Sequence, residues 1–237
     1  MKTLGLIGGT GWVSTLEYYR LINQGVNAVL GGNNAAKLFL YSVNYHEFRA
    51  YNDNKQWPNA EGILCDAARK LESVGAECIV ICANTLHRSA KAIQASVGIP
   101  VIHIAEVVAA AIKKQNLNTV ALLGTKGTME EDFFKDILAA NGIKALIPDD
   151  ADRNFIHYTI FEELGKEIFT VETKQRYLNI INQLVQKGAQ GVILGCTEIP
   201  LLIKPEECPV PAFDTLELHV KAAVEFALSD MAANKSA

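Results

Sequence analysis

The sequence lacks the features that mark nucleic-acid-binding and membrane proteins. Its 22 Lys and Arg residues are outnumbered by 26 Asp and Glu residues, the formal net charge is −4, and there is no basic stripe of the kind nucleic-acid binding requires. No apolar run approaches the ~20 residues of a membrane span. The glycine-interrupted start has no signal-peptide cleavage pattern. These absences predict a cytoplasmic protein that binds neither nucleic acid nor membrane.

The sequence also lacks the patterns of metal, disulfide and dinucleotide sites. Its five cysteines are odd in number and include no CxxC pair, and its five histidines are scattered without metal-ligand spacing. The segment Gly9-x-Gly11-x-x-Ser14 lacks the third glycine of a dinucleotide fingerprint, and the next strand ends in Asn44 instead of an acid. We therefore expect no metal, no disulfide framework and no nicotinamide cofactor.

What the sequence does contain is an alternation of short apolar runs with segments of helical period. This alternation is typical of an α/β fold with parallel strands. Two capping-box patterns, Ser14–Glu17 and Thr128–Glu131, predict helix starts, and the acidic segment Asp149–Asp152 is expected to be a loop. The predicted strands are Leu4–Gly8, Leu38–Val43, Cys78–Cys82, Val101–Ile104, Val120–Gly124, Lys144–Ile147, Gly191–Gly195 and Val210–Ala212.

An internal repeat divides the chain into two similar halves. Gly75–Asn84 aligns without gaps with Gly188–Thr197, at an offset of 188 − 75 = 113 residues. We therefore predict two pseudosymmetric three-layer α/β domains, each with a parallel four-stranded sheet, that share one cleft. The first comprises residues 1–99 with 213–237, whose last helix returns to it, and the second comprises residues 100–212.

The predicted strand ends are rich in Gly, Thr and Asn. In parallel α/β sheets ligands bind at the carboxyl ends of strands, beside helix N-termini, so these ends suit a small carboxylate. Positions 83 and 196 are equivalent in the repeat and would face each other across such a ligand. Cys196 is the strongest candidate for chemistry, because the amide dipoles of the short helix that follows it would lower the thiol pKa.

Four segments together resemble the aspartate/glutamate racemase family, in order and over nearly the whole chain. The resemblance implies a two-domain pseudosymmetric α/β fold, cofactor-independent racemisation of acidic amino acids and a homodimer. Two bases flank the substrate α-carbon in that family, and Cys196 matches one of them. The segments are Gly8-Gly9-Thr10-Gly11-Trp12-x-Ser14-Thr15, Asn84-Thr85-Leu86-His87, Leu123-Gly124-Thr125 and Gly195-Cys196-Thr197-Glu198-Ile199.

The resemblance also implies which residues hold the substrate. A side-chain carboxylate of the substrate would need a cation, for which Arg49 is the first choice, with Asn52 as a neutral partner. Lys126, Arg153 and Lys166 are the other basic residues near predicted loops. The residues expected to hold the rest of the substrate are Gly9, Thr10, Asn84, Thr85, Thr125, Thr128 and Thr197.

The sequence departs from the family pattern at Ala83, where the family has a Cys or a Thr as its first base. Alanine neither accepts nor donates a proton, so activity is expected to be reduced or one-sided. Four interpretations stay open. A water could replace the missing group, or the alanine could be an engineered substitution in an active racemase. The protein could instead be a one-base enzyme similar to arylmalonate decarboxylases, or it could bind an amino acid without turnover.

Overall fold

A computed structural model describes residues 1–53 and 56–233, except for the side chains of residues 52, 53, 232 and 233. The chain forms two compact units. Unit 1 comprises Met1–His103 together with the segment from His219 onward, and unit 2 comprises Ile104–Leu218. The divisions therefore lie at 103/104 and 218/219, where the sequence suggested 99/100 and 212/213.

Unit 1 contains a four-stranded sheet in the order β2-β1-β3-β4, with all strands parallel. Its strands are β1 (Leu4–Gly8), β2 (Leu38–Ser42), β3 (Cys78–Ile81) and β4 (Val101–Ile102). Its helical segments are α1 (Trp12–Leu30), α2 (Tyr45–Asp53), α3 (Trp57–Ser73), the 3-10 turn η1 (Thr85–Ser89), α4 (Ala90–Ser96) and most of α11 (Thr215–Ala233).

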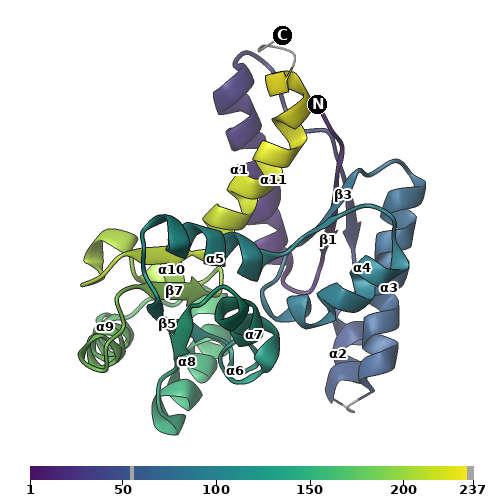
Figure 1. The fold of residues 1–237 in the computed structure, drawn as a ribbon. Helices are drawn as coiled ribbons and strands as arrows, with labels where there is room; N and C mark the ends of the chain where they lie inside the picture. Colours follow the sequence, from purple (N-terminus) through teal and green to yellow (C-terminus); the bar gives the residue numbers. More distant parts are fainter. Residues whose placement is uncertain (54–55, 234–237) are drawn as a thin grey trace. The chain divides into compact units, whose positions relative to one another are not determined.

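Helices cover both faces of this sheet. Ile7 and Ile81 are paired in register and pack with residues of α3 and α4 in one buried cluster. Leu6 and Val80 point to the opposite face, because side chains alternate along a strand, and both are fully buried. Helices α1 and α11 lie side by side in unit 1 (Figure 1).

Unit 2 repeats this strand order as β6-β5-β7-β8, again entirely parallel. Its strands are β5 (Thr119–Gly124), β6 (Lys144–Leu146), β7 (Val192–Gly195) and β8 (Ala212–Asp214). Its helical segments are α5 (Ile104–Lys114), α6 (Lys126–Glu130), α7 (Asp132–Ala140), α8 (Asp150–Glu162), η2 (Leu164–Lys166), α9 (Val171–Gln186), α10 (Ile199–Leu202) and η3 (Pro205–Glu207).

The core of unit 2 also has two faces. Leu123 and Leu194 pack into a cluster with buried residues of α8 and α9. Leu122 and Ile193, the neighbours of those residues along the same strands, pack into a second cluster with α5 and α7. The two sheets of equal strand order, each flanked by helices, confirm the α/β class and the parallel four-stranded sheets.

Several local predictions were wrong for identifiable reasons. The last strand begins at Ala212 instead of Val210, because Pro211 has no backbone N–H to donate to a ladder. Ile104 begins α5 instead of ending β4. The predicted loop at Asp149 is the start of α8, where the Asp149 carboxylate accepts a hydrogen bond from the Asp152 N–H as an N-cap.

Both capping boxes were also misplaced. Helix α1 begins at Trp12 after Gly11, so Ser14 lies inside the helix instead of at its N-cap. The neighbouring Thr15 hydroxyl donates to the Gly11 carbonyl. Helix α6 begins at Lys126 and is capped by Thr125 instead of Thr128. Among the described helices, none is both long and apolar enough to cross a membrane.

Candidate active site

Cys196 is the first residue after β7 in unit 2. Strand β7 lies beside β5, and the last paired residues of the two strands are Gly124 and Gly195. Cys196 is a partly buried free cysteine, and the short helix α10 begins three residues later at Ile199. The thiol therefore lies at the carboxyl edge of the sheet, where the sequence predicted it.

The two glycines are required by the packing above the strand ends. A Cβ on Gly195 would lie 2.5 Å from the Leu123 carbonyl oxygen, and one on Gly124 would lie 2.8 Å from the Gly195 carbonyl oxygen. Both would also lie within 3.2 Å of Thr128, which is fully buried. Strands β5 and β7 thus end in glycines that pack directly against Thr128, and this packing leaves no room for a larger residue at either position.

The turn after β5 is ordered by its own hydroxyls and by a histidine. Thr125 Oγ1 accepts a hydrogen bond from the Thr128 N–H at 3.4 Å and lies 3.3 Å from Thr128 Oγ1. The Lys126 N–H donates to His157 Nδ1 at 3.2 Å. Partial burial and the nearby Lys126 charge lower the pKa of His157. Thr128 is fully buried, so its contacts are with the protein, and it holds Thr125 in place. Thr125 is partly exposed.

The thiol of Cys196 donates a hydrogen bond to a carboxylate. Its Sγ lies 2.8 Å from Glu198 Oε2, and the Thr197 hydroxyl donates to the same oxygen at 2.8 Å. Burial, followed by the Glu198 charge, raises the pKa of Cys196 well above its ordinary value, although the backbone N–H groups of Thr197 and Glu198 act in the opposite direction. The sequence argument for a lowered thiol pKa is therefore wrong for this structure, since it considered only the helix terminus.

In unit 1 the corresponding strand end carries Ala83, Asn84 and Thr85. Ala83 and Thr85 are partly buried and Asn84 is buried, and η1 begins at Thr85. The His87 ring donates through Nδ1 to the Ala83 carbonyl at 3.0 Å, because a carbonyl oxygen can only accept. The backbone at position 83 is therefore held by a side chain one turn further on.

The turn after β1 is equally constrained. Gly9 has φ +93°, and a Cβ there would lie 2.2 Å from the Val43 carbonyl oxygen. Its N–H donates to the Thr15 hydroxyl at 3.0 Å, so this amide is already used within the protein. Thr10 is partly exposed beside it.

His87 belongs to a cluster of three buried residues and the partly buried His103, which the sequence did not predict. Its ring centroid lies 4.9 Å from that of His103 and 5.3 Å from that of His219. His219 donates through Nε2 to the Ile102 carbonyl at 2.7 Å, so its Nδ1 accepts from the Tyr18 hydroxyl at 2.8 Å. Burial lowers the pKa of His219 to about 4 and that of His87 well below its ordinary value. We name His87, His103, His219 and Tyr18 the histidine cluster.

The candidate cations for a substrate side chain differ in their partners. Arg153 is engaged by Glu130, at 2.9 Å, and by Asp150, while Lys166 pairs with Glu162 at 2.6 Å. Both therefore have structural explanations. Arg49 lies exposed on α2 and Lys126 is partly buried in α6. The side chain of Asn52 lies outside the described residues.

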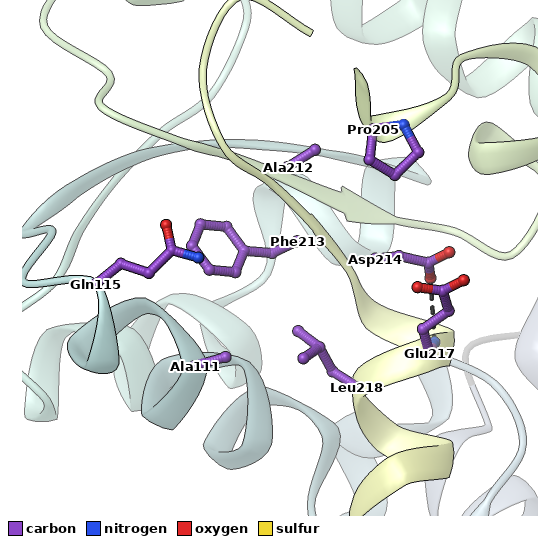
Figure 2. Close-up of a pocket in the computed structure, with 8 residues that line it drawn as sticks. All are labelled: Ala111, Gln115, Pro205, Ala212, Phe213, Asp214, Glu217 and Leu218. Atoms are coloured by element: carbon purple, nitrogen blue, oxygen red, sulfur yellow. Dashed lines mark hydrogen bonds between the residues drawn. The ribbon is translucent and has the colours of Figure 1, made fainter. Parts of the chain in front are cut away.

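A cavity of about 210 Å³ lies elsewhere in unit 2, beside β8 and the first turn of α11 (Figure 2). Asp214 lines it and accepts hydrogen bonds from the Leu216 and Glu217 N–H groups at 2.8 and 3.3 Å, so its carboxylate caps α11. Burial raises the pKa of Asp214 to about 6. Neither Cys196 nor Thr125 lines this cavity. The lining residues are Ala111, Gln115, Pro205, Ala212, Phe213, Asp214, Glu217 and Leu218.

Sequence reasoning gave no role to Glu198 or His157. Glu198 was present in the quoted motif, and the usable signal was its position two residues after a strand-end cysteine. His157 comes to Lys126 only through the fold, so no local signal could have found it. Within the described residues, no group of three or more His, Cys, Asp or Glu side chains could hold a metal ion.

Comparison with known proteins shows the family to which the chain belongs. The sequence profile of the family described as Asp/Glu/Hydantoin racemase matches residues 7–223. The chain belongs to this family. The racemase family fold is seen in a Yersinia pestis protein proposed to be an Asp/Glu racemase, which is 44% identical, with a TM-score of 0.93 over 96% of this chain and 100% of that one.

Two further relatives support the same family assignment. An aspartate racemase homologue from Pyrococcus horikoshii OT3 is 36% identical, with a TM-score of 0.86 over 96% of this chain and 99% of that one. A glutamate racemase from Carnobacterium sp. (strain St2) is 32% identical over 126 residues, which are 52% of this chain and 46% of that protein.

Proposed function

We propose that the protein is a cofactor-independent racemase of aspartate or glutamate that acts through Cys196, with activity limited by Ala83. Membership of the racemase family supports the reaction class. Cys196 is assigned as the base on one observation: its thiol lies at the carboxyl end of β7 and donates a hydrogen bond to Glu198. The thiol lies beside a turn of hydroxyls and backbone N–H groups suited to an anion.

The proposed chemistry begins with removal of the α-proton by the Cys196 thiolate. The α-proton of an amino acid is weakly acidic, so the carbanion needs hydrogen bonds to its carboxylate. Thr125 and Thr197 in unit 2, with Asn84 and Thr85 in unit 1, are the proposed donors. Thr10 and Arg49 complete the proposed substrate contacts. The Gly9 N–H is left out, because it already donates to Thr15.

Inversion needs a second proton carrier on the opposite face of the α-carbon, because a single base tends to return the proton to the face it came from. Position 83 is that carrier in the family pattern, and here it is alanine. We therefore propose that α-proton exchange on one enantiomer is faster than conversion into the other. A water near Ala83 would supply the slow second step.

Ala83 also favours a second candidate function. A one-base enzyme that protonates a carbanion after loss of carbon dioxide would need the thiol alone. It would act on a malonate-type diacid instead of an amino acid. Binding of an acidic amino acid without proton exchange is a third outcome, which the same experiment detects.

The resemblance further implies a homodimer, which we carry over as part of this proposal. Light scattering of the purified protein should give twice the 25.8 kDa mass of the chain. A monomeric mass would remove the dimer from the proposal without affecting the chemistry.

The deciding experiment is proton NMR of L- and D-aspartate and L- and D-glutamate with the protein in deuterated water. Loss of the α-proton signal from at least one of them is expected, with slower appearance of the opposite enantiomer on a chiral column. No exchange with any of the four would contradict the racemase proposal. Release of carbon dioxide from an arylmalonate would then establish the second candidate, whereas heat of binding without exchange would establish the third.

A further inference from the structure

The proposed racemase chemistry gives no role to the carboxylate of Glu198, although this group contacts the Cys196 thiol. It does not cap α10, since no side-chain hydrogen bond is made at that N-cap. Within the described residues its hydrogen bonds come from Cys196 and Thr197, and no ion pair joins it to a cation. By contrast, Glu162 and Glu207 of the same unit pair with Lys166 and Lys174. Glu198 is thus directed at the thiol instead of at a neighbouring lysine.

A protonated thiol cannot remove an α-proton, so Cys196 must first lose its own. The Sγ to Oε2 distance of 2.8 Å puts an acceptor in direct contact with that proton. The backbone N–H groups of Thr197 and Glu198 face the sulfur and favour its charge once the proton has left. Burial raises the pKa of Tyr177 of α9, which lies close enough to Cys196 and Glu198 for their charges to raise it further. Glu163 at the end of α8 acts on Tyr177 in the same direction. The carboxylate of Glu163 is occupied by the Thr173 hydroxyl at 2.6 Å.

We propose that Glu198 is the proton acceptor that converts the Cys196 thiol into the reactive thiolate. In the first step the proton passes from Sγ to Oε2, which leaves a thiolate and a neutral carboxylic acid. In the second step the thiolate takes the α-proton of the substrate and the electron pair remains on the α-carbon. This second step rests on the proposed racemase function, whereas the first step needs no substrate.

The same carboxyl group connects the sulfur to solvent. When the carboxylic acid loses its proton to water, the regenerated carboxylate accepts the thiol proton, and a solvent deuteron can return to the sulfur by the reverse path. That deuteron is then passed to the α-carbon. The net change is replacement of one α-proton by one deuteron, with one proton released to water. Exchange on a single face therefore needs only Cys196 and Glu198.

The experiment compares the wild-type protein with Glu198→Gln and Glu198→Asp. The glutamine keeps the shape and accepts a hydrogen bond but cannot take a proton, while the aspartate keeps the carboxylate. Glu162→Gln is the matched control, because it removes an exposed carboxylate of unit 2 that pairs with Lys166. Circular dichroism and thermal unfolding establish that each variant is folded.

The first measurement is the rate of Cys196 alkylation by iodoacetamide as a function of pH, with the labelled peptide identified by mass spectrometry. If Glu198 takes the thiol proton, wild-type reactivity rises in two steps. The first step follows ionisation of the carboxyl group and the second follows ionisation of the thiol. Glu198→Gln should lose the first step, and its remaining step should lie about one pH unit lower, because the neighbouring negative charge is gone. A single-step wild-type profile would overturn the proposal.

The second measurement is α-proton exchange of the amino acid on which the wild type acts. Glu198→Gln should slow exchange about 100-fold or more, although its thiol ionises more readily. Glu198→Asp should retain a measurable part of the activity. If the Glu198 carboxylate only positioned Thr197 or only opposed thiolate formation, Glu198→Gln would exchange the α-proton as fast as the wild type or faster. That result would refute the proposal.

The two measurements separate this inference from the racemase proposal. A two-step alkylation profile in a protein that exchanges none of the four amino acids would support Glu198 as the acceptor and reject the racemase function. Exchange that persists unchanged in Glu198→Gln, together with a single-step alkylation profile in the wild type, would support the racemase function and reject Glu198 as the proton acceptor.

Discussion

The carboxyl ends of β3 and β7 occupy equivalent places in two sheets of equal strand order, yet they differ in chemistry. After β7, Cys196 donates to Glu198 in a partly buried setting. After β3, Ala83 carries no ionisable group, and its carbonyl is held by His87 of the histidine cluster. The repeat has therefore preserved a backbone position without preserving its side chain. Unit 2 uses this place for an ionisable pair, whereas unit 1 uses it for buried hydrogen bonding.

The largest expected effect comes from making the β7 end resemble the β3 end. Cys196→Ala removes the proposed base and should reduce α-proton exchange by at least about 1,000-fold, as expected for loss of the acting base. NMR in deuterated water measures the loss. Cys208→Ser, at a cysteine near the end of η3, is the control and should retain exchange. Exchange that survives Cys196→Ala would show that another group is the base.

The converse change makes the β3 end resemble the β7 end. Ala83→Cys supplies a proton carrier at the position where the proposed mechanism lacks one, and it should speed conversion between enantiomers about 100-fold relative to the present protein. Chiral chromatography measures the conversion. Ala83→Thr and Ala83→Val form a matched pair, because they have nearly the same shape and only threonine carries a hydroxyl. An equal response to threonine and valine would mean that shape alone limits the reaction.

Two buried groups, His219 of unit 1 and Asp214 of unit 2, should change the stability with opposite signs as the pH falls. The folded-state pKa of His219 is lowered to about 4 from an ordinary value of 6.5, so the unfolded chain takes up this proton first. The stability that the neutral ring contributes is present above about pH 6.5 and is lost as the pH falls towards 4, with a size of about 3 kcal/mol. His87, whose pKa is also lowered, acts in the same direction.

Asp214 of unit 2 opposes this trend. Its folded-state pKa is raised to about 6 from 3.8, so its burial destabilises the fold at neutral pH and the penalty falls as the pH drops below about 6. Urea unfolding at pH 7.5, 6 and 5 measures both effects. His219→Gln should flatten the loss of stability on acidification, and Asp214→Asn should flatten the opposing gain. If both variants keep the wild-type slope, the pH dependence arises elsewhere.

The smallest expected effects concern two glycines. Gly195→Ala should destabilise the fold by about 1–3 kcal/mol, because the added methyl group lies 2.5 Å from a backbone oxygen. Gly62→Ala lies in the helix α3 with nothing within 4 Å of the added atom, and it should stabilise by about 0.5–1 kcal/mol. Thermal unfolding of the two variants measures the contrast. A stable Gly195→Ala protein would mean that the β7 end can move.

The comparison also explains how far the sequence could predict this molecule. Strand β1 has the predicted bounds, because Leu4–Gly8 is a continuous apolar run bounded by a turn of glycines. The repeat gave the two sheets, since an ungapped match preserves the register of a strand and its following turn. The hydroxyl residues were ambiguous in the sequence, because Ser14 and Thr128 each begin a capping-box pattern, whereas in the structure both lie inside helices.

The site was predicted less completely than the fold. The strand-end position, the repeat and the polar neighbours made Cys196 the candidate thiol. The direction of its pKa shift depends on where the Glu198 side chain points, which the sequence does not encode locally. The histidine cluster joins residues from α1, η1, the β4 end and α11, far apart along the chain. Such contacts form only when the chain folds, so the spacing of the histidines along the sequence did not predict the cluster.

The glycine ends of β5 and β7 limit where the site can be redesigned. Thr128 packs over Gly124 and Gly195, and a side chain at either glycine would press against Thr128 and against backbone oxygens, so these three positions form a closely packed foundation. New substrate preference must therefore come from the residues that line the rim, among which Thr125 and Lys126 are partly exposed. A mutational library that spares the foundation and varies the rim would keep most of its members folded.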